Sequence, residues 1–108
     1  MPDVYMCIDG VPVWAELKII KNNRASLSKS QIAWHLAHSR CGGVSFFLLH
    51  EPSTGDVFLF DGGSALDISG SRSLIAGACD PAPVWCGPLR AAPAALRACA
   101  LESWSLRA

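Results

Sequence analysis

The sequence predicts an α/β fold in which a small mixed β-sheet is flanked by helices. Two strand-like runs, Val4 to Ile8 and Val11 to Ile20, are separated by Asp9-Gly10, a dipeptide typical of a two-residue hairpin turn. A helical segment, Lys29 to Arg40, follows a polar loop, and an apolar strand-like run, Val44 to Leu49, comes next. The order strand, strand, helix, strand over the first half of the chain supports the α/β class.

Both ends of the helical segment carry boundary signals. Ser26 or Ser28 can supply the N-cap, because a serine hydroxyl accepts hydrogen bonds from the first unpaired backbone N–H groups. At the other end, Cys41-Gly42-Gly43 ends the helix, since glycine adopts the left-handed conformation that follows a helix C-terminus.

Composition limits the class of protein. The chain has 108 residues, 51% of them hydrophobic, which fits one domain with a small core. No apolar run reaches the roughly 18 residues of a membrane helix, and the N-terminus is too polar for a signal peptide. Five cysteines without C-x-x-C spacing argue against a disulfide framework and a standard zinc site. We therefore expect a cytoplasmic protein with reduced thiols and no membrane association.

The hairpin register predicts a pair of carboxylates. A two-residue turn pairs Ile8 with Val11, and continuing the register places Asp3 opposite Glu16 at a non-hydrogen-bonded position, where Cα atoms approach to about 4.5 Å. Two facing carboxylates repel each other, and a divalent cation would remove that repulsion. Mg²⁺ prefers oxygen ligands and often takes only one or two carboxylates. A surface hairpin without a metal is the alternative reading.

Lys18 shares the face of Glu16, because side chains two apart on a strand point the same way. Opposite charges nearby favour its ionised form. An ammonium at this position could orient a water molecule and offset charge that builds on a phosphate oxygen. A plain Glu–Lys pair is common by chance, so the register opposite Asp3 carries most of the argument.

Pro2-Asp3 followed by Glu16-Leu17-Lys18 resembles the PD-(D/E)xK nuclease motif. The segments Ser26 to His35 and Cys41 to Val44 resemble the VRR-NUC branch, which is found in phage nucleases and is related to Holliday-junction resolvases. The resemblance covers residues 2 to 50. It implies a restriction-endonuclease-like fold and a Mg²⁺-dependent DNA endonuclease, for which Mn²⁺ substitutes, in the cytoplasm of a bacterial or phage-infected cell.

The resemblance also implies roles for individual residues. Asp3 and Glu16 would hold the metal with the backbone carbonyl of Leu17, Lys18 would position the attacking water, and Gln31 would assist near the metal. Gln31 as a simple helix cap is the alternative. An N-terminal helix usually precedes the motif in the family, so we expect another segment or subunit to cover that side of the sheet, or a site with fewer ligands.

Charge distribution favours a polyanionic partner, although the net charge of the chain is zero. Between Ala15 and Arg40, five basic side chains face one acidic side chain, a net charge of +4. We expect DNA contacts from Lys21, Arg24, Lys29 and His35. An ordinary solvated surface is the alternative. A homodimer or higher homo-oligomer would present two sites to branched or flapped DNA, but no pattern specifies one.

We divide the chain into a nuclease core, residues 1–70, and an Ala/Pro-rich extension, residues 71–108. In the core, Val57 to Phe60 predicts another strand, and Gly62 to Ser69 a short helix. The helix would turn three residues inward: Ala65, Leu66 and Ile68.

In the extension, Ala78 to Pro88 is expected to be irregular, with Trp85 as an anchor. Pro93 begins a final helix over Ala94 to Leu106. Its apolar stripe would pack on the core, where the N-terminal helix of the family would sit, or form an interface. The stripe consists of Leu96, Cys99, Ala100 and Trp104.

Two functions of different classes remain open from the sequence. The first is the metal-dependent endonuclease. The second is a catalytically weak nucleic-acid-binding or assembly module on the same fold, which would bind DNA without needing a metal. A purely structural phage or mobile-element protein would show neither property.

Overall fold

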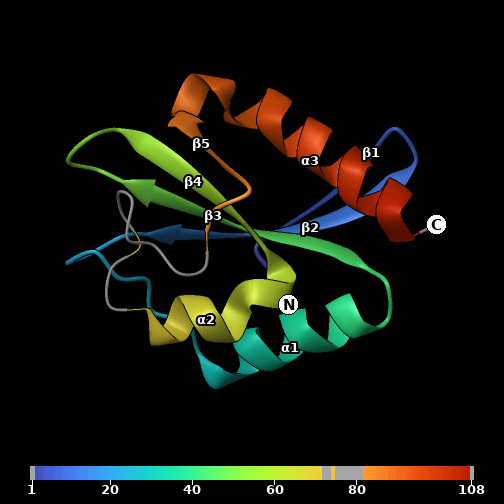
Figure 1. Cartoon of the computed structure of the whole chain (residues 1–108), viewed down its shortest axis with the longest axis horizontal. Coiled ribbons are helices and arrows are strands. Elements are labelled where there is room, and N and C mark those ends of the chain that lie inside the picture. The colour runs from blue at the N-terminus through green and yellow to red at the C-terminus, as the bar shows by residue number, and fades with distance from the viewer. Residues whose placement is uncertain (1, 72–73, 75–81, 108) are drawn as a thin grey trace.

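The computed structural model describes residues 2–71, 74 and 82–107 of the chain. A five-stranded mixed sheet, in the order β1-β2-β3-β4-β5, has helices α1 and α2 on one face and α3 on the other (Figure 1). The predicted α/β class, a mixed sheet flanked by helices, is confirmed.

The strands follow the chain order across the sheet. Antiparallel pairing joins β1 (Val4–Ile8) to β2 (Val11–Ile19), and β2 lies parallel to β3 (Val44–Glu51). The next strands, β4 (Asp56–Asp61) and β5 (Trp85–Pro88), each pair antiparallel with the preceding one. The parallel step between β2 and β3 requires a crossover, which α1 supplies. Strands β1 and β5 are therefore the two edges.

The first hairpin has the predicted turn and register. Asp9 and Gly10 have φ angles of 50° and 84°, as a type I′ turn requires. Ile8 pairs with Val11, and Val4 with Ala15. The register that predicts the carboxylate pair is thus present up to the residue that follows Asp3.

Helix α1 (Lys29–Arg40) has the bounds expected from the sequence. Ser28 is its N-cap, in a capping box with Gln31. At the C-terminus, Gly42 has a φ of 81° and its N–H donates to the Ser39 carbonyl, which completes a Schellman-type ending.

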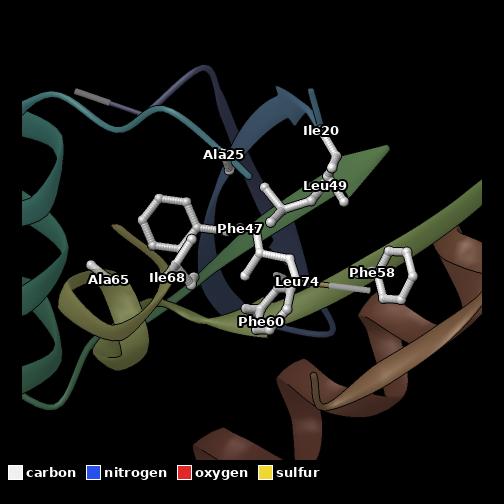
Figure 2. Close-up of a cluster of buried hydrophobic side chains, with 9 residues drawn as sticks. All are labelled: Ile20, Ala25, Phe47, Leu49, Phe58, Phe60, Ala65, Ile68 and Leu74. Carbon is white, nitrogen blue, oxygen red and sulfur yellow. The ribbon is translucent and has the colours of Figure 1, made fainter. Parts of the chain in front are cut away.

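Each face of the sheet builds its own core. The face beneath α1 and α2 gathers nine buried side chains, which Figure 2 shows around Phe47, Leu49 and Phe60. The opposite face packs Val13 and Val44 against α3. Strand β3 contributes to both cores, because successive side chains on a strand point to opposite faces.

Two expectations for the middle of the chain need correction. A 3₁₀ turn (Gly62–Ser64) leads into α2 (Ala65–Gly70), and Ala65 and Ile68 are buried there, but Leu66 is 60% exposed. The helix is too short to bury more than one narrow stripe. Trp85 to Pro88 forms β5 rather than an irregular segment, because its backbone pairs with β4. Residues 78–81 lie outside the described residues.

The last helix, α3 (Ala92–Arg107), follows a 3₁₀ turn (Leu89–Ala91) and packs on the sheet. Leu96 and Ala100 are buried against it, but Trp104 is 41% exposed. A row spaced by four residues rotates about 40° per step around a helix of 3.6 residues per turn, which carries Trp104 away from the sheet.

Two further observations concern membrane-spanning helices and cysteines. Within the part of the chain that the structure describes, no helix combines the length and apolarity needed to cross a membrane. Four cysteines in that part are free thiols: Cys7, Cys41, Cys86 and Cys99. Cys79 lies outside it.

Candidate active site

The open end of the β1–β2 ladder brings Asp3 to Glu16. Asp3 comes just before β1, and its carboxylate oxygen Oδ2 accepts a hydrogen bond from the backbone N–H of Leu17 at 3.0 Å. The side chain thus takes the place of a backbone carbonyl acceptor at the end of the β1–β2 ladder. This contact fixes Asp3 beside the strand that carries Glu16.

Glu16 is a buried carboxyl, with 1% of its surface exposed. Burial raises the pKa of this carboxyl above its ordinary value of 4.5, and a hydrogen bond and the charge of Asp3 raise it further. The nearby Lys18 ammonium acts in the opposite direction on the same pKa. Among the residues that the structure describes, Glu16 Oε1 has no hydrogen-bond partner. The geometry therefore holds two interacting carboxyls with one buried oxygen unsatisfied.

Lys18 lies on the same face of β2, half-buried at the edge of the core beneath α1 and α2. In the register with β3, Glu16 lies opposite Phe47 and Lys18 opposite Leu49. On the β3 side, both groups therefore have apolar neighbours. In such a setting, electrostatic interactions are stronger than in water.

His35 lies in the core below Glu16, which corrects the expectation that it contacts nucleic acid. It is fully buried on α1, and its Nε2 is 3.5 Å from Glu16 Oε1, too far for a good hydrogen bond. Burial, with an electrostatic contribution from the nearby His38, lowers the pKa of His35 from 6.5 to about 4. The imidazole is therefore neutral at neutral pH, and the contact is not an ion pair.

Two residues that the sequence analysis did not single out hold His35 in place. Ser45 Oγ on β3 is 2.9 Å from His35 Nδ1. Gly62 packs over both groups, since a Cβ there would lie 1.9 Å from Ser45 Oγ and 3.1 Å from His35 Nδ1. The position of His35 three residues after Ile32 was a signal of its inward direction, whereas nothing in the sequence pointed to Ser45 or Gly62.

Gln31 has a structural role at the start of α1. Its Oε1 accepts a hydrogen bond from the Ser28 backbone N–H at 2.9 Å, and its own N–H donates to Ser28 Oγ at 3.1 Å. Among the described residues, its side chain bonds to Ser28 and not to the paired carboxyls. The structure therefore favours the capping alternative for this residue.

The three basic residues expected to contact DNA are exposed beyond the end of β2. Lys21 and Arg24 flank a second tight turn, in which Asn22 and Asn23 have φ angles of 52° and 62°. Both basic residues line a cavity of about 340 Å³. Lys29 is exposed in the first turn of α1.

The donor atoms fit a hard divalent cation. No group of three or more His, Cys, Asp or Glu side chains suited to a metal occurs in the described ranges. Asp3 and Glu16 supply two carboxyls, however, and the register directs the Leu17 carbonyl toward the same side as Asp3. Oxygen donors of this kind suit Mg²⁺ or Mn²⁺ better than Zn²⁺. Among the described residues, Glu16 Oε1 has no hydrogen-bond partner, although His35 Nε2 lies 3.5 Å from it.

A larger cavity, of about 480 Å³, lies on the other face of the sheet. It is lined by Phe46 of β3 and by Cys99, Glu102 and Leu106 of α3. Because Phe46 points away from the face that carries Glu16, this cavity is separate from the paired carboxyls.

A scan against protein-family models and searches of curated proteins and solved structures gave no match.

Proposed function

We propose that the protein is a metal-dependent hydrolase of DNA phosphodiester bonds with a restriction-endonuclease-like core. The pairing of Asp3 with the buried Glu16, with Lys18 on the same face, carries this proposal. The order of β1, β2, α1 and β3 and the resemblance to the PD-(D/E)xK motif support it.

The residues of the chain divide the work of hydrolysis. Asp3, Glu16 and the Leu17 carbonyl would hold Mg²⁺ or Mn²⁺. Bound there, the ion would polarise the phosphate and lower the pKa of a coordinated water. Lys18 would orient the attacking water and offset the negative charge that develops on the phosphate oxygens. The neutral His35, held by Ser45, would keep Glu16 in position from below.

The basic residues define where the DNA backbone would lie. Lys21 and Arg24 continue from the end of β2 beyond Lys18, and Lys29 lies at the start of α1. Phosphates on either side of the scissile bond would contact these side chains. Binding through them would weaken as salt concentration rises, because it releases counterions.

The test is cleavage of a fluorescent DNA panel, consisting of single-stranded, duplex, flap and four-way-junction substrates, with Mg²⁺, Mn²⁺ or EDTA. We expect metal-dependent cutting that is lost in Asp3→Asn and Glu16→Gln and slowed at least about a hundredfold in Lys18→Ala. Glu102→Gln removes an exposed carboxyl on the opposite face and should cut normally. Equal cutting by wild type and the three site variants would contradict the assignment.

A DNA-binding module without catalysis is the second candidate. The placement of Gln31 in the helix cap favours it, since the resemblance implies that this residue assists near the metal. It predicts DNA binding in EDTA that is unchanged by Mg²⁺, with no cutting of any panel member.

A further inference from the structure

A row of aromatic rings crosses the sheet surface from its β1 edge toward α1. The ring centroids of Tyr5 and Trp14 are 4.6 Å apart, with planes inclined by 49°. Trp14 meets Trp34 edge to face at 5.7 Å, and Trp34 stacks on His38 at 4.6 Å. The row therefore runs from an edge strand, over β2, onto the helix that covers this face.

The row lies directly beside the paired carboxyls. Tyr5 pairs with Trp14 in the β1–β2 ladder, and each is two residues from Asp3 or Glu16 along its own strand. Residues two apart on a strand share a face and lie about 7 Å apart. On this face of the hairpin, the Tyr5–Trp14 pair is thus the cross-strand pair next to Asp3 and Glu16.

The outer ring of the row is open to solvent. Tyr5 is 54% exposed on the edge strand, while Trp14 and Trp34 are half-buried. Packing on one side fixes the orientation of the Tyr5 ring, and the other side is available. A large, oriented and exposed aromatic ring costs little conformational entropy when it binds a flat partner.

We propose that Tyr5 and Trp14, supported by Trp34, form a stacking surface for an unpaired base next to the scissile phosphate. This inference rests on the proposed function, because that function is what identifies the ligand as a DNA strand. It specifies the substrate as single-stranded DNA or a strand that leaves a duplex at a flap, fork or junction.

Base pairing decides which DNA can use this surface. Inside a duplex, each base is already stacked on both sides, whereas an unpaired base can place a free face on an aromatic ring. Stacking of this kind tolerates any base, so little sequence preference is expected.

Charge favours a nucleic acid over an apolar protein partner at this surface. On the other side of Glu16, the strand leads through Lys18 to Lys21 and Arg24. Residues 15–40, which begin directly after Trp14 and include Trp34, carry a net charge of +4. Aromatic rings on one side of a site and basic side chains on the other are the two components of single-strand recognition.

Fluorescence anisotropy tests the inference by measuring DNA binding to the full-length Glu16→Gln protein in EDTA. The substitution removes one carboxyl group, and the variant and EDTA together prevent cleavage of the probe. The probes are a short fluorescein-labelled single strand and its duplex. We expect tighter binding of the single strand, and about fivefold or greater weakening in Tyr5→Leu, with duplex affinity unchanged. Tyr5→Phe keeps the ring and should bind normally. Trp104→Leu, which removes an exposed ring on α3, is the matched control.

A second measurement leaves the protein unaltered. Single abasic positions are placed in turn along the strand, and one position should weaken binding by the same factor as Tyr5→Leu. Tyr5→Leu combined with that abasic position should then weaken binding no more than either change alone, because both remove the same ring–base contact. Thermal unfolding of each variant confirms that its fold is retained.

Either of two results would overturn the inference: equal single-strand affinity in Tyr5→Leu and wild type, or equal weakening for both DNA probes. Self-association of the wild type that is lost in Tyr5→Leu, with DNA binding unaffected, would also overturn the inference and assign the surface to a second copy. If the hydrolase proposal is wrong and this inference is right, no metal-dependent cutting will be seen, but single-strand binding will still depend on the Tyr5 ring.

Discussion

At the scale of single residues, the site contains a buried carboxyl whose burial lowers the stability of the folded protein. Glu16 is buried, and its Oε1 has no hydrogen-bond partner among the described residues. A buried polar atom without a partner opposes folding. The neutral His35 below and the Asp3 carboxyl beside it do not relieve this cost. A bound cation would, which links metal binding to stability.

Replacing the carboxyl by an amide should therefore stabilise the metal-free protein. The raised pKa of Glu16 means that the folded state holds its proton more tightly than the unfolded state, so stability falls as pH rises above 4.5. In urea unfolding with EDTA, Glu16→Gln should be more stable than wild type at neutral pH. The difference should disappear below pH 4.5.

Mg²⁺ provides the matched comparison, because it should raise the unfolding midpoint of wild type and leave Glu16→Gln unchanged. A variant that is less stable than wild type at neutral pH in EDTA would show that the ionised carboxylate has a stabilising partner, contrary to this description of the site.

At the scale of elements, α1 links the two parallel strands and also covers the site. Its capping box and its Schellman-type ending fix both of its ends. Because His35 and Trp34 occupy successive positions on α1, the same helix supplies the support below Glu16 and the inner ring of the aromatic row. A shift of its first turn would therefore disturb both features.

Gln31 variants separate capping from catalysis. Gln31→Ala removes half of the capping box and should lower the free energy of unfolding by about 1 kcal/mol. Gln31→Glu keeps an acceptor for the Ser28 N–H and should retain stability. If Gln31 only caps the helix, both variants should cut DNA at the wild-type rate at a temperature where they are folded. A large loss of cleavage rate in the stable Gln31→Glu variant would show that Gln31 takes part in catalysis as well as capping the helix.

At the scale of the whole molecule, the sheet is stable only when both faces are covered. Helices α1 and α2 cover one face, and the second core needs α3, which follows β5 near the end of the chain (Figure 1). Residues 85–107, which the sequence predicts to belong to an extension, thus add the fifth strand and the second helical layer to the same sheet.

Leu96→Ala should lower the free energy of unfolding by about 2–4 kcal/mol, because it removes a buried side chain from the second core. Leu106→Ala on the same helix is the control, since Leu106 is 82% exposed and its loss should change stability by less than about 0.5 kcal/mol. Urea denaturation measures both. A chain that ends at Ser69 should lose cooperative unfolding, and a folded truncated chain would contradict the need for α3.

Local patterns were sufficient for the first hairpin and for the bounds of α1. The Asp9-Gly10 turn fixes the hairpin register, because its two residues accept positive φ, and the register in turn places Asp3 beside Glu16. Serine and glycine signals set the ends of α1 correctly. These features depend on residues close together in the sequence, where backbone preferences and the strand period decide the outcome.

Contacts between distant residues decided the rest. The sequence by itself determined the fold class, the bounds of α1 and the pairing of the two carboxyls. Only the tertiary structure buried His35 under Glu16, paired β5 with β4 and brought Trp34 of α1 against Trp14. The physical reason is that each of these arrangements depends on packing between elements. Helical periodicity can indicate that a side chain points inward, but not which residues of other elements it will contact.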